Sequence, residues 1–564
     1  MSDRISRVEA RLQQVDEAVA CLARRLEALE DRLRPADAPI VGGSAPATAA
    51  TLPSASLRRA DHVVVLQLVG RTLIVLGGAY LLRALTQSGQ ISTPAGVVLG
   101  LLYAGVWLAA ADRAAAASAL FYGLAAVLVA LPIVWEGSTR FQLLSPIAGA
   151  ITLAAVIALT LGVAWHRQLR MLALTVAAAT FVISVALAAQ VGQPVTFAAV
   201  LLGFAAMSLW VAYQRRWMGL AVLTALAIDV VLVALAVRAS VVPPRDPAIS
   251  VLALQAAFVG VYLASFAVRS LVVRQPLGGF EFAQAALALA VGLGGAVMVT
   301  RANGLPFSVV GTAAAIGAVA AYTAAFTPLL ARRASISGWY FFSSLGLVLA
   351  VIAGFLLLPR SAVVITLGAG AIASTAERTP ARVRTLTVHS AITLVAAGYA
   401  SGLFSLMAAV WLTTLTEWPP LPTPAWTVMA AALLCFVIAS LGATNSDRVV
   451  SFVRTLFGAL VVAGLCSVLI LQAGPGLIGA APDAGGLATL KSIVLAAAAV
   501  LLAWTRRVSQ LAELSRLTYP LLIAGGLKIL LEDLASSRPA TLFVAFALYG
   551  AALILAPRVL KSRL

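Results

Sequence analysis

Most of this 564-residue chain is a series of apolar segments, each long enough to cross a membrane as a helix. Hydrophobic residues make up 62% of the sequence and charged residues only 11%, whereas a soluble chain carries about 25% charged residues. A water-soluble core of this size would need far more polar surface to cover it. The sequence therefore predicts an all-α fold, a polytopic transmembrane helical bundle of about 18 spans.

The loops between these segments carry a charge pattern that predicts their sides. If the N-terminus is cytoplasmic, basic residues are more frequent in the inward loops than in the outward loops. Arg454 is among the residues expected in the inward loops. Both termini are then cytoplasmic, and the net charge of +18 needs no nucleic acid to explain it. The expected spans are residues 62–83, 94–111, 114–135, 143–165, 171–191, 194–213, 218–237, 249–268, 280–300, 305–330, 338–359, 361–376, 386–410, 424–443, 449–472, 487–504, 517–535 and 540–557. The basic residues expected in outward loops are Arg83, Arg140, Arg238, Arg245, Arg301, Arg360, Lys491 and Arg538.

A different pattern occupies residues 1–34, where apolar residues from Ile5 to Leu33 alternate in spacings of three and four. This is the seam of a left-handed coiled coil. Arginines on one flank match acids on the other in a parallel pairing, which predicts a parallel homo-oligomer; dimer and trimer both stay open. The alternative is a helix that folds back on its own membrane domain or binds another protein. The predicted domains are a coiled-coil stalk over 1–34, a flexible Pro/Ala/Ser-rich linker over 35–61 and a transmembrane domain over 62–564. The matched flank pairs are Arg4–Glu9, Arg11–Asp16 and Arg25–Glu30.

Three charged residues are expected inside the membrane. Arg71, Asp229 and Lys528 lie at depths that agree within about 5 Å at 1.5 Å per helical residue. Because buried charges in hydrocarbon are usually paired or face a cavity, we predict a candidate intramembrane polar cluster with an Arg71–Asp229 or Lys528–Asp229 pair. Alternatively, Lys528 pairs with Glu532 on its own helix or extends toward the interface. A functional cavity and a structural ion pair both stay open.

Glycines give two further signals within the apolar segments. Gly96 and Gly100 are spaced as in helices that pack closely in membranes. Gly294-Gly295 and the stretch Gly368–Gly370 are the candidates for a helix break inside a span.

Two patches at opposite ends of the chain suggest a family. The first patch is LVGRTLIVLGGAYLLRALTQSG (68–89), which contains Gly70, Gly77, Arg83 and Gly89. The second patch is near the C-terminal end, begins with LTYPLL, and contains Lys528, Asp533 and Arg538. Together they resemble the opening and closing signatures of the DUF2339 family of predicted bacterial membrane proteins. The resemblance implies a coiled-coil start followed by many spans, and it implies no reaction. Glu532, Asp533 and Arg538 are therefore secondary candidate site residues.

No motif in the sequence assigns a reaction, and neither a cofactor nor a metal site is predicted. There is no P-loop and no H-E-x-x-H pair. Our leading hypothesis is a bacterial inner-membrane protein that transports or handles a lipid or envelope component through a polar intramembrane cavity. The alternative is an envelope scaffold or sensor gathered by its coiled coil; an intramembrane enzyme ranks third. The expected partners are membrane lipids and further copies of the chain.

Overall fold

The computed structural model describes residues 77–78, 81–241, 246–327, 336–377, 380–413, 415–441, 447–507, 509–533 and 539–561. Contacts divide the chain into Met1–Gln67 and Leu68–Leu564, and all described residues belong to the second unit. The predicted stalk and linker, and the candidate residues Arg71 and Arg538, lie outside the described residues. Their predicted structure and contacts therefore stay predictions.

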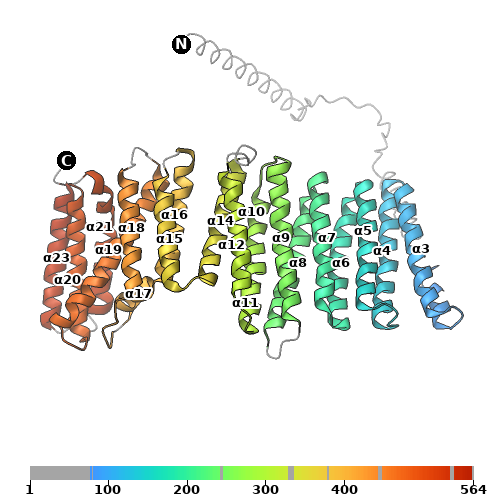
Figure 1. Cartoon of the computed structure of the whole chain (residues 1–564), viewed down its shortest axis with the longest axis horizontal. Coiled ribbons are helices and arrows are strands. Elements are labelled where there is room, and N and C mark those ends of the chain that lie inside the picture. The colour runs from blue at the N-terminus through green and yellow to red at the C-terminus, as the bar shows by residue number, and fades with distance from the viewer. Residues whose placement is uncertain are drawn as a thin grey trace, which may run out of the picture. The chain divides into compact units, whose positions relative to one another are not determined.

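The described part of Leu68–Leu564 is helical, with no strand among its residues (Figure 1). Residues 81–87 form one helical segment. The η segments are π-helical except η3, which is a 3-10 helix. The further elements are α3 (Thr93–Arg113), α4 (Ala116–Thr139), α5 (Pro146–His166), α6 (Arg170–Val191), α7 (Pro194–Arg215), α8 (Met218–Ser240), α9 (Ala248–Ala267), η1 (Val268–Val272), α10 (Gly279–Ala288), η2 (Leu289–Leu293), α11 (Gly294–Ala302), α12 (Ser308–Phe326), α14 (Ile336–Leu357), α15 (Arg360–Ala376), α16 (Pro380–Ala400), α17 (Leu403–Leu412), α18 (Thr423–Leu441), α19 (Arg448–Leu477), α20 (Ala484–Thr505), η3 (Ser509–Leu517), α21 (Thr518–Lys528), η4 (Ile529–Asp533) and α23 (Pro539–Lys561).

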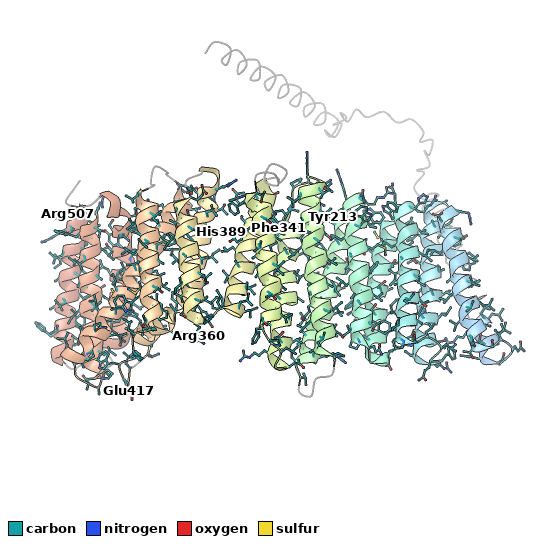
Figure 2. All side chains as sticks on the ribbon, viewed as in Figure 1. Tyr213, Phe341, Arg360, His389, Glu417 and Arg507 are labelled. Atoms are coloured by element: carbon teal, nitrogen blue, oxygen red, sulfur yellow. The ribbon has the colours of Figure 1, made fainter. Side chains whose placement is uncertain are left out.

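Short polar or proline-containing turns set the ends of these helices. Pro146 and Pro194 begin α5 and α7, because proline is tolerated in the first helical turn, where its missing N–H leaves no hydrogen bond unmade. Asp447 and Asp483 cap α19 and α20, each accepting a hydrogen bond from a backbone N–H of the first turn. Gly192 ends α6 in the left-handed region. In Figure 2 the charged Arg507 lies at one edge of the helices, and Arg360 and Glu417 lie at the opposite edge.

The helices match the predicted segments closely. Fifteen of them, among the described residues, are long and apolar enough to cross a membrane. The pair Arg382–Ala400 and Leu403–Leu412, bent by 71°, would make sixteen as one broken span, and Arg360–Ala376 is a shorter apolar helix. The expected first span, 62–83, lies mostly outside the described residues. The all-α, many-helix fold is thus confirmed, whereas the count of 18 spans stays a prediction.

Small residues fill many of the helix contacts together with buried leucine and phenylalanine, and other large aliphatic residues are exposed on the outer faces of the helices. Ala111 and Ala119 are fully buried, while Leu102 and Ile151 are 61% and 64% exposed. Membrane helices associate through small residues because lipid is as apolar as leucine, so burying leucine between helices gains little. The largest apolar cluster joins α4 to α14, and smaller clusters join helices from α14 to α23.

The predicted helix break at Gly294-Gly295 is not found, because Gly279–Ala302 is one continuous span in which a π turn, η2, directly precedes Gly294. The span from Gly279 to Ala302 is α-helical up to Ala288, π-helical over η2, and α-helical again from Gly294. The helix break predicted at Gly368–Gly370 is wrong, because α15 continues through these residues without interruption. Neither Gly368 nor Gly370 is in the left-handed region, so the glycines there require no break.

Candidate functional site

A group of ionisable side chains lies where α20 packs against α21 and η4. Lys528 Nζ lies 2.5 Å from Asp533 Oδ1 and donates to Ser492 Oγ at 2.8 Å. Ser492 in turn donates to Asp533 Oδ2 at 2.7 Å, and Lys528 also donates to the carbonyl oxygen of Ala488. The carboxylate of Asp533 is therefore held by both an ammonium group and a hydroxyl group.

A second ion pair lies beside the first. Lys491 Nζ donates to Glu532 Oε1 at 2.7 Å, and the lysine side chain is only 1% exposed. Asp533 is fully buried. Two cations and two anions sum to zero charge, which limits the cost of burying them, because an unpaired buried charge would cost several kcal/mol. We call this group the lysine–carboxylate network; it consists of Lys491, Ser492, Lys528, Glu532 and Asp533.

The π turn η4 gives the network its geometry. In a π turn the backbone bonds join residues five apart, so residues five apart lie one turn apart on the same side of the helix. Lys528 and Asp533 have this separation. In a regular α-helix a separation of five would place them about 140° apart around the axis. The predicted alternative paired Lys528 with Glu532, four residues on along the same helix. The local pairing was therefore placed on the wrong acid: Lys528 pairs with Asp533, and Glu532 pairs with Lys491.

The network forms one wall of a pocket of about 620 Å³. Lys491, Lys528 and Glu532 supply its charged wall. The remaining lining is mostly apolar and comes from α17, α19, α20 and α21. These residues are Trp411, Leu412, Thr413, Ala463, Cys466, Leu495, Leu521, Ala524, Leu527 and Leu531. Such a pocket has the features of a ligand site: apolar walls and a few converging polar groups.

Asp229 lies in a separate and differently built environment. It is on α8, is 6% exposed, and accepts hydrogen bonds from Gln284 Nε2 on α10 at 3.1 and 3.3 Å. Among the described residues, no cation lies within ion-pair distance of it. A neutral amide is thus its observed partner.

The predicted Lys528–Asp229 pair is not formed. Helix α8 packs against α6, α7, α9, α10 and α11, whereas α21 packs against α20, α23 and η3. Similar depth along the membrane normal made the pair possible, but the two helices have different lateral neighbours. Arg71, the other predicted partner of Asp229, lies outside the described residues.

The helices that pack against α8 carry further buried polar groups. Gln255 on α9 is fully buried, and neither polar atom of its side chain has a hydrogen-bond partner among the described residues. A Cβ at Gly295 would come within 2.4 Å of Gln255 Nε2, so glycine is what allows this glutamine to sit against α11. Glu281 on α10 lies 3.6 Å from Arg269, which itself lies over the ring of Tyr213.

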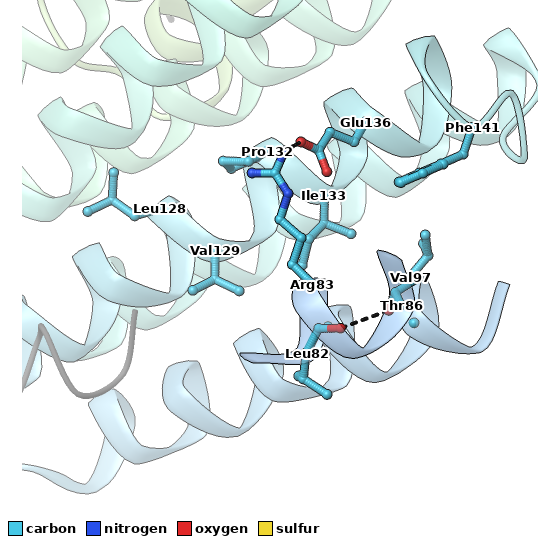
Figure 3. A pocket seen from close by; sticks show the side chains of 12 residues that line it. Leu82, Arg83, Thr86, Val97, Leu128, Val129, Pro132, Ile133, Glu136 and Phe141 are labelled. Atoms are coloured by element: carbon cyan, nitrogen blue, oxygen red, sulfur yellow. Dashed lines mark hydrogen bonds and ion pairs between the residues drawn. The ribbon is translucent and has the colours of Figure 1, made fainter. Parts of the chain in front are cut away.

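Another ion pair lies in the pocket shown in Figure 3, between residues 81–87, α3 and α4. Arg83 Nη2 lies 2.5 Å from Glu136 Oε1, with Pro132 beside it. The pocket has a volume of about 360 Å³. Because Arg83 is 41% and Glu136 20% exposed, this ion pair is more accessible than the lysine–carboxylate network.

The Gly96-to-Gly100 motif borders the same pocket. A Cβ at Gly96 would come within 2.2 Å of Thr86 Oγ1, and one at Gly100 within 2.5 Å of Ile133. The motif therefore permits close packing of α3 against two neighbouring segments, as its spacing predicts.

Two basic residues were wrongly assigned to loops. Lys491 was expected in an outward loop but lies within α20, and Arg454 was expected in an inward loop but is a buried residue of α19. The expected spans 449–472 and 487–504 already enclose both residues near their starts, so their assignment to loops disagreed with the span boundaries themselves. One signal could have identified Lys491: only three of the 39 basic residues are lysines, and two of the three are in the network. Lysine is a compact charge on a flexible stem, whereas arginine is a planar fork.

No protein-family model, curated protein or solved structure matches this chain. The resemblance to the DUF2339 family therefore stays a prediction. What the fold itself defines is a class: many apolar helices with exposed aliphatic side chains are consistent with a multi-pass membrane protein.

Proposed function

We propose that this protein binds an amphiphilic envelope component in the pocket beside the lysine–carboxylate network and moves it across the membrane. The single observation that carries the proposal is a pocket of about 620 Å³ with a charged wall and an otherwise mostly apolar lining. A lipid-like molecule would match this lining, because its apolar body suits the apolar walls and its ionised head suits the charged wall. We further propose that the membrane is the bacterial inner membrane, with both termini cytoplasmic.

Glu532, in the Lys491–Glu532 pair, is the more exposed carboxylate of the network and is the one that lines the pocket. Glu532 is 30% exposed and Lys491 only 1% exposed. An incoming phosphate or carboxylate would take the place of Glu532 at the Lys491 ammonium group, and Glu532 would then accept hydrogen bonds from the ligand's amine or hydroxyl groups. The inner pair, Lys528 with Asp533, would keep the wall in place during this exchange, since Asp533 is fully buried.

Lipid movement in proteoliposomes tests the proposal. The purified full chain is reconstituted with a short-chain fluorescent phosphatidylethanolamine, and dithionite added outside reports the rate at which the probe changes leaflet. The informative variant is Lys491→Gln with Glu532→Gln, because removing both partners leaves no unpaired buried charge. The matched control is Arg238→Gln with Asp246→Asn, another ion pair with a 2.9 Å contact, which lies on α8 and its following loop.

We expect the wild type and the control to accelerate probe movement and the pocket variant to lose most of that rate. A wild-type rate equal to that of empty liposomes would contradict the proposal, as would equal loss in both variants. The scaffold or sensor alternative predicts that neither variant alters lipid movement. That alternative depends on the predicted coiled coil, which lies outside the described residues.

A further inference from the structure

A second polar pocket lies where the start of α19 meets η3 and α21. Its volume is about 550 Å³. Arg448, Ser451, Thr455, Glu513 and Arg516 form its polar part. Its apolar part is a continuous strip formed by Phe452, Leu456, Ala459, Leu517 and Pro520. Both helices that supply the strip belong to candidate membrane spans, Arg448–Leu477 and Glu513–Asp533, so the polar part lies at the ends of two spans.

Among the described residues, Glu513 is the only acid that lines this pocket, and it is already paired from the buried side. Arg454, which is 9% exposed in its side chain, forms an ion pair with Glu513, and its Nη1 also donates to the carbonyl oxygen of Ala439. Arg454 does not line the pocket. It neutralises Glu513 from behind and leaves the two lining arginines, Arg448 and Arg516, as the excess charge facing outward.

Arg516 is positioned but not neutralised. Its Nη1 donates to Ser451 Oγ at 2.5 Å, and its Nη2 lies 4.0 Å from Glu513, at the limit of an ion pair. Ser451 Oγ in turn donates to Glu513 Oε1 at 3.1 Å. A guanidinium group has five N–H donors, and the Arg516 side chain is 60% exposed. It therefore keeps donors directed at the pocket mouth while Ser451 holds its orientation.

We propose that this pocket binds one anionic phospholipid from the surrounding leaflet. The phosphate would accept hydrogen bonds from Arg448 and Arg516, since guanidinium groups match phosphate oxygens in geometry and charge. One acyl chain would lie along the apolar strip from Leu517 to Phe452. The charge pattern of the loops predicts that this side is cytoplasmic, where anionic headgroups are enriched. The site is separate from the lysine–carboxylate network and does not depend on transport.

Native mass spectrometry of the full chain in detergent tests this site, with dioctanoyl phosphatidylglycerol as the probe and dioctanoyl phosphatidylcholine and glycerol 3-phosphate as comparisons. The test variant is Arg448→Gln with Arg516→Gln. The matched control is Arg506→Gln with Arg507→Gln, which removes the same charge from exposed arginines at the end of α20. A second test variant, Ala459→Trp, fills the apolar strip without changing charge.

We expect phosphatidylglycerol to bind the wild type and the control alike, and at least about tenfold more weakly to either test variant. For the charge-removing variant, tenfold corresponds to about 1.4 kcal/mol, close to the lower end of the range for one hydrogen bond to a charged group. Phosphatidylcholine should bind the wild type more weakly than phosphatidylglycerol. Equal affinity of the charge-removing variant and the control would overturn the site. Equal binding of both lipids would overturn its anionic character, and equal binding of glycerol 3-phosphate would show a soluble phosphate ligand instead of a lipid.

Discussion

Asp229 and Asp533 are both buried carboxylates in apolar helices, yet the chain accommodates them in opposite ways. Asp533 is fully buried and bound by the Lys528 ammonium and the Ser492 hydroxyl. Asp229 is 6% exposed and bound by the amide of Gln284, with no cation nearby among the described residues. The arrangement at Asp533 stabilises a buried carboxylate with an opposite charge and lies beside a pocket. The second relies on a neutral donor within a tightly packed helix group. Burial alone therefore does not distinguish a charged site from a polar one; the partners do.

The largest expected effect is at Asp533. Asp533→Asn removes the anion and leaves Lys528 buried without its counter-charge, which should lower the free energy of unfolding by about 3–5 kcal/mol. Denaturant titration of the purified protein in bicelles measures this. Adding Lys528→Gln to the same variant should restore part of the loss, because the stranded charge is then gone. If Asp533→Asn alone unfolds at the wild-type denaturant concentration, the network is not held by charge.

The Asp229 region should be sensitive to packing. Gly295→Ala places a Cβ within 2.4 Å of Gln255 Nε2 and 3.2 Å of Ala236 Cβ, and overpacking of this kind costs about 1–3 kcal/mol. The matched control is the neighbouring Gly294→Ala, whose Cβ meets nothing within 4 Å and which should gain up to about 1 kcal/mol from reduced backbone entropy. Thermal unfolding of the two variants should move in opposite directions. Equal shifts would mean that Gln255 does not pack as described.

A smaller effect is expected for Asp229 itself. Asp229→Asn keeps a side-chain oxygen for Gln284 Nε2, so the change should cost less than about 1.5 kcal/mol, the range of one neutral hydrogen bond. Comparing it with Asp533→Asn in the same titration tests the contrast directly. A loss as large as that at Asp533 would reveal a cationic partner outside the described residues. In that case, combining Asp229→Asn with Arg71→Gln should restore stability, which would identify Arg71 as the partner.

The smallest effect is expected at the most accessible ion pair. Arg83→Gln removes the partner of Glu136 in the pocket of Figure 3. Because Arg83 is 41% exposed, the change should alter the free energy of unfolding by about 1 kcal/mol or less. A loss above that obtained with Gly295→Ala would show that this pair is shielded from water and would place it with the lysine–carboxylate network.

Several residues of the candidate site could be named from the sequence. Lys528, Glu532 and Asp533 stand out as charges within or beside an apolar segment, and the structure places all three in one network. Ser492 and Gln284 could not be named, because an uncharged polar residue in a helix gives no sign of what it faces. Lys491 was missed for another reason: a charge near the edge of a segment has the same pattern whether it ends the helix or enters it.

The sequence by itself determined where the helices lie along the chain, because the length of an apolar segment and the charges that flank it are local properties of the sequence. It also predicted a depth for the charges within spans, since depth follows from the residue count along a helix. Only the tertiary structure decided which charges meet. Lateral neighbours depend on small residues that let particular helices approach, as Gly295 does for Gln255, and on π turns such as η4, which bring Lys528 over Asp533. Asp229 and Lys528, which were predicted to share a depth, belong to different sites, because hydropathy constrains position along the membrane normal and packing alone constrains position within its plane.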